Sequence, residues 1–114
     1  MTAARAKRVE RRRIQWRRFD WRGITIAVAY EADWLGSGKL GSDLARAHLQ
    51  IEAVKPERAR LPITETGYLS HFIGRHVIES AGGPSAYMTA WLDEAAKDRR
   101  WIEAEDQARQ LSLF

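Results

Sequence analysis

The chain has 114 residues, no Cys, five Trp and a formal net charge of +4 at pH 7. This length predicts one domain, and the lack of Cys excludes disulfides, thiolate metal sites and Cys nucleophiles. Its 45% hydrophobic and 30% charged residues are typical of a folded domain. No uncharged stretch is long enough for a membrane span, and no apolar segment follows the basic N-terminal residues as in a secretory signal. We therefore expect a cytoplasmic bacterial protein, and this location is compatible with association with the nucleoid.

The positive charge is concentrated near the N-terminus. Residues 1–22 hold nine basic residues against two acidic ones, a net charge of +7, whereas the remaining residues carry ten basic against thirteen acidic ones, −3. Basic side chains that neutralise phosphates release counterions, so residues 1–15 are predicted to form an arm that contacts nucleic acid. The candidate contacts are Arg5, Lys7, Arg8, Arg11, Arg12, Arg13, Arg17 and Arg18. The alternative is a solvated tail that aids solubility.

Aromatic residues follow the basic ones directly. Trp16, Phe19 and Trp21 carry rings that can stack on bases, which favours the nucleic-acid interpretation. Phe19 and Trp21, however, fit better as the start of a strand that packs on the core. A turn at Arg22–Gly23 then joins this short strand to the next one.

Two alternating stretches predict the central strands. Apolar residues occupy every second position over 24–31 and again over 45–54, which is the period of a half-buried strand. Between them, Asp33–Asp43 contains three Gly and two Ser and is predicted to be a loop. Residues 63–73 predict a further strand, irregular or with a bulge at Gly67.

The second half of the chain is predicted to be helical. Residues 77–81 suit a short turn, and Pro84 suits the first position of a helix, where its missing N–H is no loss. Apolar residues recur at helical spacing from Tyr87 onward, and the helix either continues to Gln110 or breaks near Asp98 and restarts. The sequence thus predicts an α+β domain over residues 16–109, with a small antiparallel sheet of three to four strands covered by one or two C-terminal helices.

The last five residues carry a recognisable pattern. Gln110, Leu111, Ser112, Leu113 and Phe114 resemble, at all five positions, the pentapeptide by which many bacterial proteins dock on the β sliding clamp of the replicative polymerase. The resemblance implies that Leu113 and Phe114 are paired apolar anchors, that Leu111 adds apolar contact and that Gln110 forms hydrogen bonds. The alternative is an apolar end that packs back onto the helices.

A second resemblance covers most of residues 21–114. The stretches Trp21–Ile26, Leu61–Tyr68, Ser70–Phe72, Gly82–Pro84 and Ala90–Asp93 are similar to those of small uncharacterised proteins of bacterial plasmids and integrative elements. This likeness implies a mobile-element setting. It brings no known activity and no catalytic residues.

The sequence offers no convincing catalytic motif. Walker, GxGxxG, HExxH and nucleophile-elbow patterns are absent, and Gly36–Lys39 lacks the spacing of a phosphate loop. The only polar groups that could form a site are those of Glu65, Tyr68, Ser70, His71, His76 and Glu79. His71 and His76 lie five residues apart, off the spacing of a helical metal pair, and His48 with Glu52 fits a solvated strand face. We therefore expect no enzyme, no metal and no cofactor.

Three functions remain open at this point. The first is a non-enzymatic, DNA-associated accessory protein of a mobile element that docks on the sliding clamp through Gln110–Phe114 and contacts nucleic acid through its basic arm. It would either be recruited to the clamp or occupy the clamp pocket and displace host clients. The second is an adaptor or homo-oligomer whose apolar tail packs internally. The third is a small hydrolase built on the cluster around His71.

Overall fold

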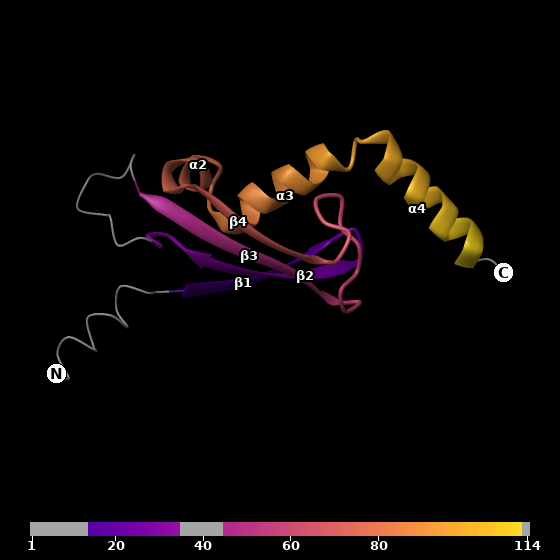
Figure 1. The fold of residues 1–114 in the computed structure, drawn as a ribbon, viewed down its shortest axis with the longest axis horizontal. Coiled ribbons are helices and arrows are strands. Elements are labelled where there is room, and N and C mark those ends of the chain that lie inside the picture. The colour runs from indigo at the N-terminus through magenta and orange to yellow at the C-terminus, as the bar shows by residue number, and fades with distance from the viewer. Residues whose placement is uncertain (1–13, 35–44, 113–114) are drawn as a thin grey trace.

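The computed structural model describes residues 14–34 and 45–112, with Ser112 described in its backbone only. Within these residues a four-stranded antiparallel sheet, in the order β1-β2-β3-β4, is followed by helices (Figure 1). The elements are β1 Ile14–Trp21, β2 Ile24–Glu31, β3 Arg46–Lys55, β4 Tyr68–Gly74, α2 Arg75–Ser80, α3 Pro84–Ala95 and α4 Arg99–Ser112. The predicted α+β fold is confirmed. No helix in these ranges is both long and apolar enough to cross a membrane.

The first hairpin forms where the alternation predicted it. Arg22 and Gly23 connect β1 to β2 with φ angles of 49° and 84°. Two successive positive φ angles give the turn whose twist matches that of paired strands. β1 begins at Ile14, so the last two residues of the predicted arm, Ile14 and Gln15, already belong to the sheet.

The connection from β3 to β4 differs from the prediction. The strand expected from residue 63 begins only at Tyr68, and residues 61–67 form turns and bends. Gly67 has φ 76°, and a Cβ there would lie 2.6 Å from the carbonyl carbon of Arg58. This close backbone approach requires Gly and turns the chain just before the strand. Gly67 is thus part of a turn and not a bulge within β4.

The core lies between one face of the sheet and the helices. Side chains of β2 and β3, such as Val28 and Leu49, are fully buried against Met88 and Leu92 of α3. Each such side chain contributes roughly 1.5–3 kcal/mol by leaving water. The Trp21 Nε1 donates a hydrogen bond of 2.9 Å to Asp93, which joins β1 to α3.

The C-terminal helical region is interrupted near Asp98, between α3 and α4, which confirms one of the two alternatives predicted from the sequence. The Asp98 carboxylate accepts a 2.7 Å hydrogen bond from the backbone N–H of Arg100 and so caps α4. Among the side chains of α4 that the structure describes, only Trp101 is buried. Figure 1 shows α4 extending beyond the sheet, with its last turn at the opposite end of the molecule from the start of β1.

Candidate functional site

The face of the sheet opposite the helices is lined by side chains from all four strands. We call this surface the open face. Cross-strand register arranges it in three rows, from β1 to β4: Ile14, Glu31, His48, Phe72; Trp16, Ala29, Gln50, Ser70; and Arg18, Ala27, Glu52, Tyr68.

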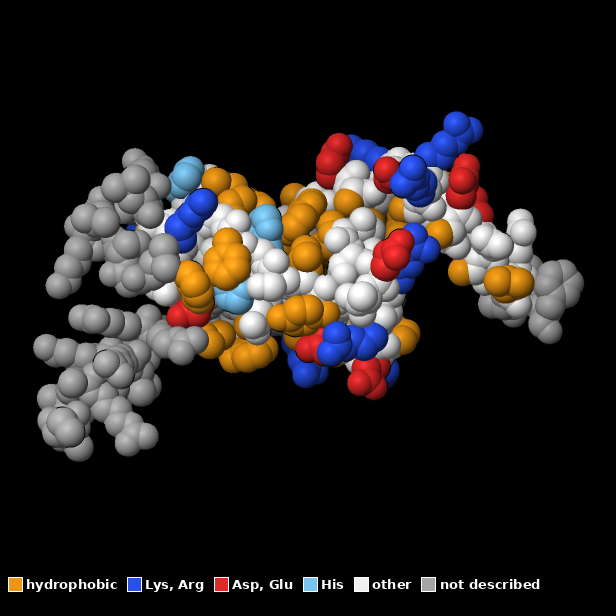
Figure 2. Space-filling model, viewed as in Figure 1, with side chains coloured by type: hydrophobic (Ala, Val, Ile, Leu, Met, Phe, Trp, Pro, Cys, Tyr) orange, Lys and Arg blue, Asp and Glu red, His pale blue; other side chains and the backbone are white. Residues whose placement is uncertain are grey.

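Large apolar side chains are exposed on and beside the open face. Trp16 is 66% exposed, Phe72 48% and Tyr68 37%, and Trp34, which follows β2, is 42% exposed. Figure 2 shows hydrophobic and His side chains side by side on the half of the molecule that carries α2, whereas acidic and basic side chains gather toward α4. Grouped exposed apolar side chains mark interaction surfaces more often than chance.

A cluster of rings occupies one corner of the open face. The Phe72 ring stacks on His48 at 4.3 Å between centroids and meets the edge of Trp34 at 4.8 Å. The His48 Nε2 and the Ser70 Oγ share a hydrogen bond of 2.6 Å. The backbone N–H of Trp34 is bonded to the carbonyl of Arg46 at 2.9 Å. These contacts hold the rings in place although they remain open to solvent.

Two hollows follow β2 across the open face, because Ala27 and Ala29 are shorter than their neighbours. One, of ≈ 400 Å³, lies between Trp16 and Glu52. The other, of ≈ 190 Å³, lies between Ile14 and His48. The open face is therefore grooved along its second strand.

The charges around this groove are mixed. Arg18 belongs to the open face, whereas the Arg17 guanidinium turns back to the Trp16 carbonyl at 3.0 Å. Glu52 is paired with Arg58 at 3.4 Å, and the Arg58 guanidinium lies 5.7 Å from the centre of the Tyr68 ring. The other six candidate arm residues lie outside the described part of the chain: Arg5, Lys7, Arg8, Arg11, Arg12 and Arg13.

The predicted clamp-binding residues fall at the end of α4. Gln110, Leu111 and Ser112 form its last turn, and the side chain of Leu111 is 69% exposed. Leu111 therefore makes no core contact, contrary to a tail packed on the helices at this position. Leu113 and Phe114 lie outside the described residues.

The polar cluster proposed around His71 does not form. Tyr68 and Ser70 are on the open face, whereas His71 points to the covered face. There the His71 Nε2 lies 3.2 Å from the Tyr87 hydroxyl, and its ring centre lies 4.6 Å from that of Trp91. Burial lowers the pKa of His71, and the nearby His48 contributes in the same direction. The alternation of side chains along a strand would by itself have predicted that Ser70 and His71 lie on opposite faces of the sheet.

The remaining members of that cluster are apart as well. Glu65 pairs with Arg60 at 3.7 Å and Glu79 with Arg75 at 3.6 Å, and His76 is exposed on α2. Within residues 14–34 and 45–112 no group of acidic, His or Cys side chains could hold a metal ion. The Gly36–Lys39 segment falls outside the described residues, as does most of the predicted Asp33–Asp43 loop.

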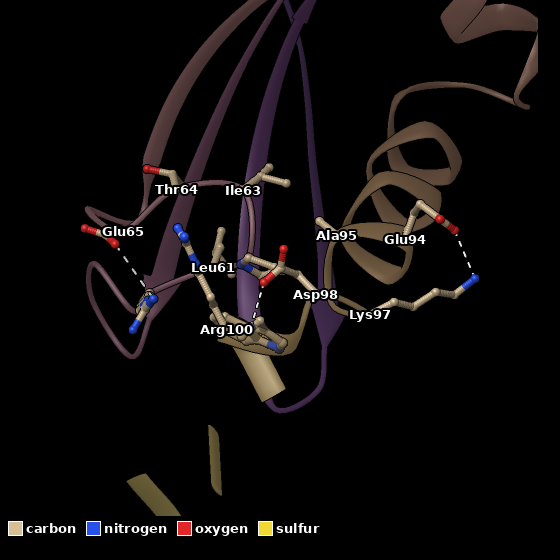
Figure 3. Close-up of a pocket in the computed structure, with 12 residues that line it drawn as sticks. Leu61, Ile63, Thr64, Glu65, Glu94, Ala95, Lys97, Asp98 and Arg100 are labelled. Carbon is tan, nitrogen blue, oxygen red and sulfur yellow. Dashed lines mark hydrogen bonds and ion pairs between the residues drawn. The ribbon is translucent and has the colours of Figure 1, made fainter. Parts of the chain in front are cut away.

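A larger pocket of ≈ 650 Å³ lies between residues 60–65 and the α3–α4 connection (Figure 3). Its three carboxylates are already engaged. Glu65 pairs with Arg60, Glu94 with Lys97 at 3.0 Å, and Asp98 caps α4. These carboxylates are thus occupied by structural partners and do not converge on a common point.

Fold and surfaces together define an α+β domain with one covered and one open sheet face. The family model of the KlcB third domain matches residues 14–101, and the chain therefore belongs to this plasmid-associated family. The match agrees with the mobile-element setting expected from the sequence. It includes the whole sheet and ends at Trp101, before the exposed part of α4. No curated protein and no solved structure matches the chain.

Proposed function

We propose that this plasmid accessory protein docks on the bacterial β sliding clamp through Gln110–Phe114 while its basic N-terminal residues contact nucleic acid. The observation that supports clamp docking most is a five-position motif that begins on the exposed last turn of α4. Leu111, the first apolar position of the motif, is 69% exposed and ready for contact. The family match supports the plasmid setting.

Docking requires the last turn of α4 to adapt to the clamp. Short peptides bind preformed pockets through a few apolar anchors and are extended in many cases. Helix ends fray readily, and beyond Trp101 no side chain of α4 in the described chain is buried. Rearranging residues 110–112 therefore leaves the core intact. Three buried apolar anchors at roughly 1.5–3 kcal/mol each, less the cost of ordering, suit a micromolar complex.

Titration of the purified clamp tests this function. We expect micromolar binding of the full chain, weakened at least tenfold in a Leu113→Ala/Phe114→Ala double variant. Ile102→Ala is the matched control, because Ile102 is an exposed apolar residue of the same helix outside the motif. Isothermal titration calorimetry gives both the affinity and the stoichiometry. Absence of binding, or equal loss in the control, would contradict clamp docking.

A further inference from the structure

The open face groups exposed aromatic rings on one side of the sheet, as interaction surfaces commonly do. Trp16 projects from β1 at 66% exposure, and Phe72 and Tyr68 project from β4 on the same side. β1 and β4 are separated by three strand spacings, about 14 Å. The face therefore offers flat apolar surfaces along two opposite edges with a groove between them.

We propose that the open face is a stacking platform for single-stranded nucleic acid, an inference that rests on the nucleic-acid contact proposed above. Every base has a flat π-face, so aromatic side chains on a sheet bind unpaired bases with little regard to sequence. Bases inside a duplex are already stacked on their neighbours and cannot cover these rings. The platform selects single strands for this reason.

The groups between the rings suit a nucleotide chain. Gln50 and Ser70 occupy the middle row, and His48 adjoins them. Amide, hydroxyl and imidazole groups donate and accept hydrogen bonds, as the edges of unpaired bases require. The hollow above Ala27 leaves room beside Trp16 for a base or a sugar, and the hollow above Ala29 adjoins Trp34 and His48.

Basic residues lie on β1, the strand that carries Trp16, and precede it in the sequence. Arg18 lies in the row next to Trp16, and in the sequence Arg11, Arg12 and Arg13 directly precede Ile14, the first residue of β1. Residues 1–13 hold six basic residues against one acidic residue. Two acidic side chains belong to the face: Glu31, which is buried, and Glu52, which forms an ion pair with Arg58. Phosphates of a strand that lies across the face beside Trp16 would meet Arg18.

A second copy or another protein fits the open face less well. The centre of a stable protein interface is depleted of charged residues and is more apolar than its rim. Here the middle row contains Gln50 and Ser70, and the next row contains Arg18 and Glu52. Rings interleaved with polar groups and flanked by basic residues favour a polyanion with bases.

Fluorescence anisotropy with the full chain tests the platform. The probes are labelled 20-nucleotide poly-dT and poly-rU and a 20-base-pair duplex, at 50 and 200 mM salt. We expect both single strands to bind more tightly than the duplex, and a higher affinity for one of them identifies DNA or RNA as the preferred strand. Trp16→Ala should weaken single-strand binding about tenfold or more. Val77→Ala, an exposed apolar residue on α2, is the control and should bind as the parent does.

A second variant distinguishes binding through the open face from binding through the basic N-terminal residues. Arg11→Ala/Arg12→Ala/Arg13→Ala should lower the affinity for single strands and duplex alike and reduce the salt dependence. If this variant loses binding while Trp16→Ala does not, the platform is overturned and the arm contact stands. If only Trp16→Ala loses binding, the platform stands and the arm contact fails.

Two further outcomes would overturn the platform. One is equal affinity for duplex and single strand. The other is a dimer, seen by sedimentation, that Trp16→Ala dissociates, since the face would then join two copies. Because Trp16 is 66% exposed, its truncation should leave the fold intact, which thermal unfolding by circular dichroism verifies. Clamp titration of Trp16→Ala should match the parent, so clamp docking is judged independently.

Discussion

His71 illustrates how one residue of β4 takes a structural role where the sequence indicated a chemical one. Its ring contacts Trp91 and its Nε2 faces the Tyr87 hydroxyl on the covered side of the sheet. Burial lowers the pKa of His71 below the ordinary value of 6.5, with a further contribution from His48. The folded protein therefore holds His71 neutral at pH values where the unfolded chain already binds a proton.

This shift predicts a loss of stability on mild acidification. The contribution of His71 is present above pH 6.5 and is lost as the pH falls through its lower folded pKa. We expect the free energy of unfolding to fall between pH 7.5 and 5.5 in the parent and to fall less in His71→Gln. Urea titrations at several pH values measure this difference. His76→Gln, which changes an exposed His, should keep the parental dependence, and the opposite ranking of the two variants would disprove the assignment.

At the scale of elements, alternation located the strands but could not set their register. The register that places Phe72 opposite His48 and Ser70 opposite Gln50 follows from pairing between distant segments, and the contacts of His48 with Ser70 and of Trp34 with Phe72 depend on it. No local pattern encodes that pairing. The strand predicted to begin at residue 63 begins only at Tyr68 for a related reason. Ile63 and Thr64 favour strands by propensity, yet the close backbone contact at Gly67 imposes turns on this segment.

Helix α4 is the element whose stability can be tested most directly. The one buried residue in the described part of α4, Trp101, lies in the first turn, and a 14-residue helix is marginal without packing. The Asp98 cap is thus a principal local stabiliser. Asp98→Ala should cost about 1 kcal/mol and raise amide exchange in α4 about fivefold, while α3 keeps its protection.

Hydrogen exchange of individual amides measures this effect. Asp106→Ala is the matched control, since it removes only an exposed pair with Arg109 on the same helix, and it should raise exchange less. Equal protection of α4 in the parent and in Asp98→Ala would show that the cap does not control the helix.

For the whole molecule, the two proposed contacts lie at opposite ends. The open face begins at Ile14, at the end of the sheet far from the last turn of α4 (Figure 1). The sequence indicated the tail by a motif and the arm by its charge. The open face could not be predicted from the sequence because its residues come from four strands. Of the rings on this face, only Trp16 is singled out by the sequence as able to stack on bases. The sequence thus suggested the clamp and nucleic acid as partners, whereas the open face could be recognised only once the pairing of the strands was known.

This separation predicts that clamp and single strand bind together and not in competition. When two weak sites are linked, the second contact forms at a raised effective concentration. We therefore expect the chain to bind a clamp loaded beside a single-stranded gap at least tenfold more tightly than a clamp without DNA. Trp16→Ala and Leu113→Ala/Phe114→Ala should each remove this gain, and high salt should reduce it because part of the strand contact is ionic. Surface-bound clamp with and without gapped DNA provides the measurement, and equal affinities would show that the two ends act separately.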